Sequence, residues 1–170
     1  MLNTVVYSIL MDEQALHIIR EVHRMFTVQG LTLALAESCT GGLLSHYMTL
    51  LPGSSAFFQA GIVTYSNASK VRLLGFAPTT IEKYGVISDA AAREMAENVR
   101  ALLNTDYALA TTGNLGPDTL EGKERGIVFI AVSTRKKTVV KELRLAGDRA
   151  ANKEQAALGA MQFLLEIVKK

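Results

Sequence analysis

The stretch ALAESCTGGLLS occupies Ala34 to Ser45 and joins two different hydrophobic patterns. The short apolar run from Leu31 to Ala36 predicts a buried strand, because it is bounded by glycine and polar residues. Two adjacent glycines, Gly41 and Gly42, then open a predicted helix that ends near Leu50. A buried strand that leads directly into a helix is the building unit of an α/β fold.

Helices and strands alternate on both sides of this stretch. The other predicted helices run from Asp12 to about Gln29, from Ser66 to Leu74, from Pro78 to Tyr84, from Ser88 to Leu103, and from near Asp148 to the end. The other predicted strands are Phe57 to Tyr65, Tyr107 to Thr111, Ile127 to Ser133 and Thr138 to Leu145. The last two strands flank a basic turn and form a hairpin. We therefore expect one α/β domain over residues 1–170, a three-layer α/β/α sandwich with a mixed, mostly parallel sheet, in which residues 1–11 are a short N-terminal extension.

Composition excludes several classes of protein. The 170 residues are 49% hydrophobic and 20% charged, which is typical of a globular domain. With 18 basic and 16 acidic residues, the net charge of +2 gives no strong field for nucleic acid or a membrane surface. No apolar run is long enough to span a bilayer, and the N-terminus is a poor signal peptide. The single cysteine, Cys39, excludes an intrachain disulfide, and we expect a cytoplasmic protein.

The end of the first predicted strand is a candidate ligand site. In α/β sheets, ligands collect where strands end and helices begin. The backbone amides of Thr40, Gly41 and Gly42 could bind an anion there or stabilise the oxyanion of an acyl-transfer reaction. Alternatively, Ser38 or Thr40 only caps the helix and the glycines allow close packing.

A nucleophile at this position needs a base. The histidines His17, His23 and His46 do not suit, because they fall on helices away from this edge and are expected to be structural or exposed. The next strand ends in TYSNASK, which places Tyr65 and Lys70 at a second strand-to-helix junction. If both junctions share one edge, a neutral Lys70 could take the proton of Ser38, with Tyr65 as relay or oxyanion donor.

Two points stay open on chemistry alone. Burial can lower a lysine pKa far enough for it to act as a base near neutrality, but an exposed lysine stays charged. Cys39 is a rival nucleophile, because a helix N-terminus lowers the pKa of a thiol. Neighbouring side chains at a strand end point in opposite directions, so only one of Ser38 and Cys39 should face the site.

Four segments together resemble the carboxy-terminal domain of the competence/damage-inducible protein family, CinA. They are AESCTGGLLS, PGSSAFFQAGIVTYSNASKVRLLG, DYALATTG and GDR, in this order and spacing. The resemblance covers roughly Leu16 to Val168. It implies an α/β/α fold and hydrolysis of the carboxamide of nicotinamide mononucleotide to nicotinic acid mononucleotide and ammonia, within pyridine nucleotide recycling.

The resemblance also implies roles for individual residues. Ser38 would be the nucleophile, Lys70 the general base and Tyr65 an assisting group, without a metal or an organic cofactor. The substrate-binding residues expected from the matching segments are Thr40, Gly41, Gly42, Thr112, Gly113 and Arg149, with Arg149 either a phosphate ligand or only a partner in an ion pair.

One segment departs from the family pattern. Members carry a glycine-rich loop after the Thr-Gly that follows the strand predicted at Tyr107 to Thr111, whereas this chain has TTGNLGPDTLEGKERG. Asp118 and Thr119 replace small glycines, so we expect Asp118 to bring a carboxylate toward the anion-binding site.

Two other functions fit the same residues. The chain could be a catalytically silent nucleotide-binding or regulatory module, or a Ser-Lys hydrolase of another small amide. We also expect a homo-oligomer, because alanine-rich segments at Ala90 to Ala92 and Ala156 to Ala160 could pack against a second subunit, and we expect no nucleic-acid or membrane partner.

Overall fold

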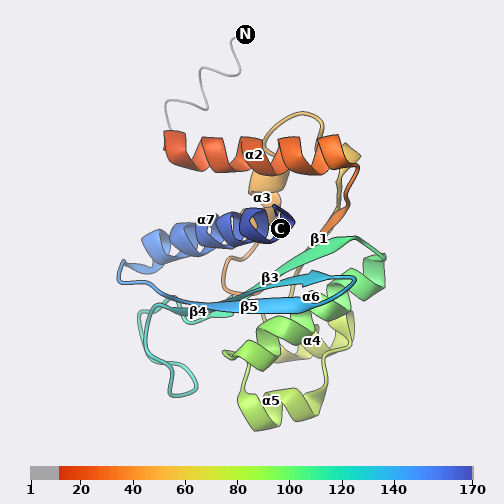
Figure 1. Cartoon of the computed structure of the whole chain (residues 1–170). Coiled ribbons are helices and arrows are strands. Elements are labelled where there is room, and N and C mark those ends of the chain that lie inside the picture. The colour runs from red at the N-terminus through yellow and green to blue at the C-terminus, as the bar shows by residue number, and fades with distance from the viewer. Residues whose placement is uncertain (1–11, 170) are drawn as a thin grey trace.

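The predicted alternation of helices and strands is present in the computed structural model, which describes residues 12–169 (Figure 1). The predicted extension, residues 1–11, lies outside the described residues. The elements in chain order are α2 (Glu13–Gln29), β1 (Leu33–Glu37), α3 (Leu43–Thr49), the 3₁₀ turn η1 (Ser54–Ala56), β2 (Phe58–Val63), α4 (Asn67–Leu74), α5 (Pro78–Tyr84), α6 (Asp89–Leu103), β3 (Tyr107–Gly113), β4 (Ile127–Thr134), β5 (Thr138–Arg144) and α7 (Arg149–Val168).

Within the described residues, the five strands form one mixed sheet in the order β2-β1-β3-β4-β5. Strands β2, β1 and β3 are parallel, whereas β4 and β5 add to β3 as an antiparallel hairpin, as predicted. Helices α2, α3 and α7 cover one face and α4, α5 and α6 lie on the other (Figure 1). This confirms the three-layer α/β/α fold.

The two faces of the sheet bury different side chains. Toward α2, α3 and α7 the strands present large residues such as Leu33, Leu35 and Leu109. Toward α6 they present mainly alanines, including Ala34 and Ala36, which allow this helix to pack closely. Of the alanines predicted to favour a second subunit, those at positions 91, 92, 156, 157 and 160 are fully buried in these intrachain cores and Ala90 is half-buried, so packing within the chain accounts for most of them.

Local signals account for most of the helix boundaries. The Asp12 carboxylate accepts from the Gln14 amide at 3.2 Å and caps α2, and Gly30 ends it at a φ of 63°. The prediction for α3 was wrong by two residues. Gly41 and Gly42 precede the helix in a turn with φ values of 57° and 98°, a conformation that favours glycine.

The fold contains a topological switch point beside β1. The chain passes from β1 to β2 on one side and later to β3 on the other, so the connections leave the carboxyl edge in opposite directions. Ser38 continues β1 at this edge, where its backbone N–H donates to the Thr111 carbonyl at 3.0 Å. Side chains that follow β1, β2 and β3 therefore meet at one edge.

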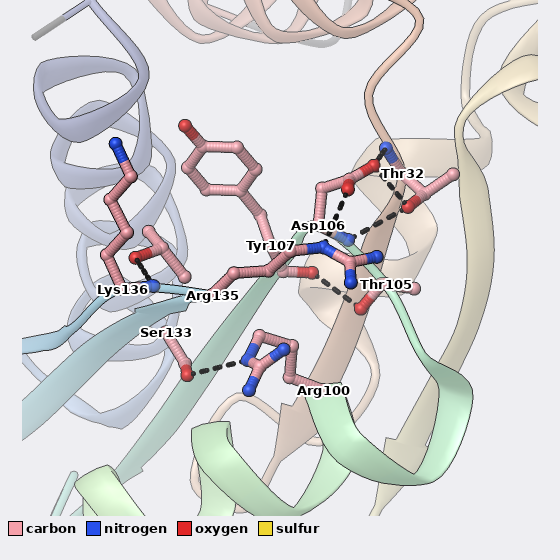
Figure 2. Close-up of polar contacts among 9 residues, drawn as sticks. Thr32, Arg100, Thr105, Asp106, Tyr107, Ser133, Arg135 and Lys136 are labelled. Atoms are coloured by element: carbon pink, nitrogen blue, oxygen red, sulfur yellow. Dashed lines mark hydrogen bonds and ion pairs between the residues drawn. The ribbon is translucent and has the colours of Figure 1, made fainter.

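The amino edge is held by a partly buried polar contact between the starts of β1 and β3 (Figure 2). The Asp106 carboxylate accepts from the backbone N–H of Thr32 at 3.0 Å and from its hydroxyl at 2.8 Å. The Arg135 guanidinium pairs with the other oxygen of Asp106 at 3.3 Å. Hydrogen bonds and ion pairing hold the pKa of Asp106 below its usual value against the opposing effect of burial.

Within residues 12–169, no helix has both the length and the apolar character needed to cross a membrane.

Candidate active site

Ser38 and Lys70 meet at the carboxyl edge of the sheet. Lys70 lies in the first turn of α4, and its Nζ is 3.0 Å from the Ser38 Oγ and 2.9 Å from the Thr64 carbonyl oxygen. Ser66 caps α4 in a reciprocal capping box with Ser69, which fixes where the helix starts. The structure therefore brings together the two residues that the sequence places 32 positions apart.

The Lys70 ammonium is almost completely enclosed, with 1% of the residue exposed. Burial lowers its pKa, and the nearby Cys39 thiol and Glu121 carboxylate only partly oppose this effect. A lowered pKa favours the neutral amine, which has the lone pair that a general base needs. The contact with Ser38 then allows the amine to accept the hydroxyl proton.

Cys39 does not have the properties of a nucleophile. Its side chain belongs to the hydrophobic core, and burial raises the pKa of the thiol to about 12. Cys39 lines the same cavity as Ser38, but the thiolate is the reactive form of cysteine and the raised pKa disfavours it. Of the two neighbours, only Ser38 has the lysine as a hydrogen-bond partner.

Glu37 is a buried residue to which sequence reasoning assigned no role. One carboxylate oxygen accepts from the Gly42 amide (2.9 Å), the Leu44 amide (3.1 Å) and the Thr40 hydroxyl (2.7 Å). The other accepts from the Ser45 amide and hydroxyl at 2.8 and 2.7 Å. The sequence does contain a signal for this role. Glu37 stands at the end of an apolar strand and just before a helix, and an acidic group stabilises a helix N-terminus.

These contacts revise the prediction for the turn before α3. The Gly42 amide donates to Glu37, and the Gly41 amide donates to the Ser38 carbonyl at 3.2 Å. Those two amides are therefore already used inside the protein and do not offer a vacant anion site. The Thr40 hydroxyl is also buried, between Glu37 and Thr111.

Tyr65 and Arg149 form a second polar group at the same edge. Tyr65 is 63% exposed, and its hydroxyl accepts a hydrogen bond from an Arg149 Nη at 2.8 Å. The other Arg149 Nη donates to the Gly116 carbonyl, so this side chain joins β2's end to the loop after β3. Among the described residues, Tyr65 has no hydrogen bond to Ser38 or Lys70, and Arg149 has no acidic partner.

A cavity of about 240 Å³ connects these groups. Ser38, Lys70, Tyr65 and Arg149 line it, as do Thr112 and Gly113 at the end of β3. Gly113 has to be a glycine, because a Cβ would lie 2.6 Å from the Ile127 carbonyl oxygen. Thr40, Gly41 and Gly42 are not among the lining residues.

The loop after β3 contributes a different acid from the one predicted. Asp118 is exposed and does not line the cavity, and only its backbone carbonyl is engaged, by the Asn114 side chain. Leu120 and Glu121 line the cavity instead. The loop thus brings a carboxylate to the site, from three residues farther along the chain.

A larger hollow, of about 430 Å³, lies at the opposite edge of the sheet. It is lined by Tyr107, Arg135 and Lys136, among others, and Figure 2 shows Arg135 turned toward Asp106. None of its lining residues is a serine, cysteine or histidine. The contact between Ser38 and Lys70 therefore makes the smaller cavity, at the carboxyl edge, the candidate site.

Comparison with known proteins places these residues in a family. A family model described as the CinA C-terminal domain matches residues 15–168. A putative competence-damage inducible protein of Acetivibrio thermocellus is 45% identical over 148 residues, which are 86% of this chain and 36% of that protein. The nicotinamide-nucleotide amidohydrolase PncC of Shewanella oneidensis is 49% identical over 116 residues, which are 68% of this chain and 27% of that protein. The chain thus spans well under half the length of these curated relatives.

Solved structures agree with this assignment. The competence/damage inducible protein CihA of Agrobacterium tumefaciens has a TM-score of 0.89 at 30% identity, covering 95% of this chain and 99% of that one. The competence damage-inducible protein A (ComA) of Klebsiella pneumoniae has a TM-score of 0.87 at 31% identity, covering 91% and 96%. On the sequence match and the shared fold together, the chain belongs to the CinA C-terminal domain family.

Proposed function

We propose that this chain hydrolyses the carboxamide of nicotinamide mononucleotide, giving nicotinic acid mononucleotide and ammonia. The observation that carries the proposal is the enclosed contact of 3.0 Å between the Lys70 Nζ and the Ser38 Oγ. A relative named nicotinamide-nucleotide amidohydrolase, 49% identical over part of the chain, supports this choice of substrate. Pyridine nucleotide recycling is the context in which such a product would be used.

The first half of the proposed reaction forms an ester. The Ser38 Oγ attacks the carboxamide carbon while the Lys70 Nζ takes the hydroxyl proton. The tetrahedral intermediate then collapses, and Lys70 returns that proton to the departing nitrogen, which leaves as ammonia. The nicotinoyl group remains on Ser38 as an acyl-enzyme.

The second half uses the same two residues with water. Lys70 takes a proton from a water molecule that attacks the ester carbonyl, and then protonates the Ser38 Oγ as the acid product leaves.

Tyr65 can donate its hydroxyl proton to the developing oxyanion, because its oxygen is the acceptor in the contact with Arg149. Arg149 is the proposed ligand of the substrate phosphate, since its guanidinium lines the cavity and has no acidic partner in the described part of the chain.

The direct test is incubation of the purified chain with nicotinamide mononucleotide, without added metal, and measurement of both products. We expect equal amounts of ammonia and nicotinic acid mononucleotide, and loss of both in Ser38→Ala. Saturable binding of the mononucleotide without product would support the silent module instead. Faster release of ammonia from other small amides would identify a Ser-Lys hydrolase of different specificity.

A further inference from the structure

Glu121 is the one acidic side chain among the described residues that line the cavity. It stands in the loop between β3 and β4, in the segment that departs from the family's glycine-rich pattern. Neither the proposed catalytic steps nor the binding of a phosphate needs a carboxylate here. Its position therefore calls for a separate explanation.

The Glu121 carboxylate is held in place from the opposite wall. Its Oε2 accepts from the backbone N–H groups of Val86 (2.9 Å) and Ile87 (3.2 Å). Gly85 has a φ of +73°, and a Cβ at this position would lie 2.4 Å from the same oxygen. The carboxylate can approach this backbone only because residue 85 has no side chain.

The cavity consequently has charges of both signs on different elements. Arg149, at the start of α7, is a permanent cation, and Glu121 is an anion on the loop. Lys70 lies between the sheet and α4, and burial favours its neutral form. Glu121 is close enough for its charge to raise the pKa of Lys70, although burial has the larger effect.

We propose that Glu121 selects substrates with a cationic ring, through attraction between its carboxylate and the pyridinium charge of an oxidised nicotinamide nucleotide. This inference rests on the proposed function. An oxidised nicotinamide ring is positively charged at its nitrogen, and its phosphate is negative. The separate placement of Glu121 and Arg149 matches this arrangement of charges, whereas a neutral amide would gain nothing from the carboxylate.

The test compares two ligands that differ in ring charge. Nicotinamide mononucleotide has a pyridinium ring, and its dihydro form has the same carboxamide, ribose and phosphate on a neutral ring. Dissociation constants are measured for both by calorimetry in the Ser38→Ala background, so that turnover does not interfere. Each is measured with Glu121 intact and with Glu121→Gln, in which the side-chain oxygen can still accept from Val86 and Ile87.

Glu124→Gln is the matched control. Glu124 is exposed in the same loop, does not line the cavity, and loses the same charge on substitution. We expect Glu121→Gln to weaken binding of the cationic ligand by about fivefold, with little change for the neutral one. Glu124→Gln should leave both dissociation constants unchanged.

Equal weakening of the binding of both ligands would overturn the proposal, because a loosened loop would weaken binding regardless of ring charge. Unchanged dissociation constants for both ligands would overturn it as well. Failure of the proposed function has a different result. In that case the intact chain releases no ammonia, whatever the binding measurements show. Ammonia release together with equal losses for both ligands would reject the role of Glu121 alone.

Discussion

Replacement of Lys70 by methionine separates catalysis from stability. Methionine approximates the volume of the lysine side chain but cannot accept a proton. We expect ammonia release from nicotinamide mononucleotide to fall by about 10²- to 10⁴-fold, the usual contribution of a general base. Lys83→Met, which removes an exposed cation from α5, is the matched control and should keep full activity.

The effect on stability follows from two opposing changes. The substitution leaves the Ser38 Oγ and the Thr64 carbonyl without their donor, at about 1 to 3 kcal/mol for each group that stays unsatisfied. It also removes the free-energy cost of burying the lysine amine. The same burial lowers the pKa of Lys70 in the folded state. We therefore expect the unfolding free energy to change by no more than about 2 kcal/mol, or about 8 °C in Tm.

The pH dependence gives a second readout. Because the pKa of Lys70 is lowered on folding, the unfolded chain keeps this proton to higher pH. The unfolding free energy of the unmodified chain should therefore rise with pH, from the lowered pKa up to about pH 10.4, and Lys70→Met should lack this rise. A folded Lys70→Met protein that keeps more than about a tenth of the activity would refute the assignment of Lys70 as base.

Three further substitutions test the surroundings of this pair. Cys39→Ala should keep activity within about twofold, because the thiol has a pKa of about 12 and is not ionised at neutral pH; rapid alkylation of the native protein at pH 7 would contradict this. Glu37→Gln should lower the unfolding free energy by about 1 to 3 kcal/mol in a denaturant titration. The NH₂ group of the glutamine would replace a carboxylate oxygen that accepts from backbone N–H groups, and these donors would lose their acceptor. Gly61→Ala should destabilise the chain, because its Cβ would lie 1.9 Å from the Ser45 Oγ, and Ser45→Ala should relieve part of this loss; additive losses in the double variant would reject the contact as the cause.

The order of elements could be predicted from sequence because each element has a local signal. Asp12 and Gly30 bound α2, Ser66 caps α4, and the basic turn at Arg135 marks the hairpin. Helix α3 was placed two residues early, because two glycines with positive φ look from sequence like a helix start. In the structure, these glycines form the turn that brings the backbone amides of Gly42, Leu44 and Ser45 to the Glu37 carboxylate.

The site was predictable in part. The meeting of Ser38 with Lys70 follows from two strand ends at one edge, a rule that depends only on parallel pairing. The contact of Tyr65 with Arg149 joins residues 84 positions apart and has no local signal. Likewise, the conformation of the loop after β3 decides that Glu121, and not Asp118, faces the cavity.

The capping of α3 by Glu37 has a consequence for how a substrate is oriented. With a carboxylate resident at the positive end of that helix, a phosphoryl group brought next to Ser38 would meet a like charge where α/β proteins commonly seat a nucleotide. In the proposed reaction, the anionic tail of the mononucleotide would therefore be directed away from Ser38, and the carboxamide would be the end that enters first. Free inorganic phosphate, abundant in any cell, should then compete only at the rim and leave the reacting serine unobstructed.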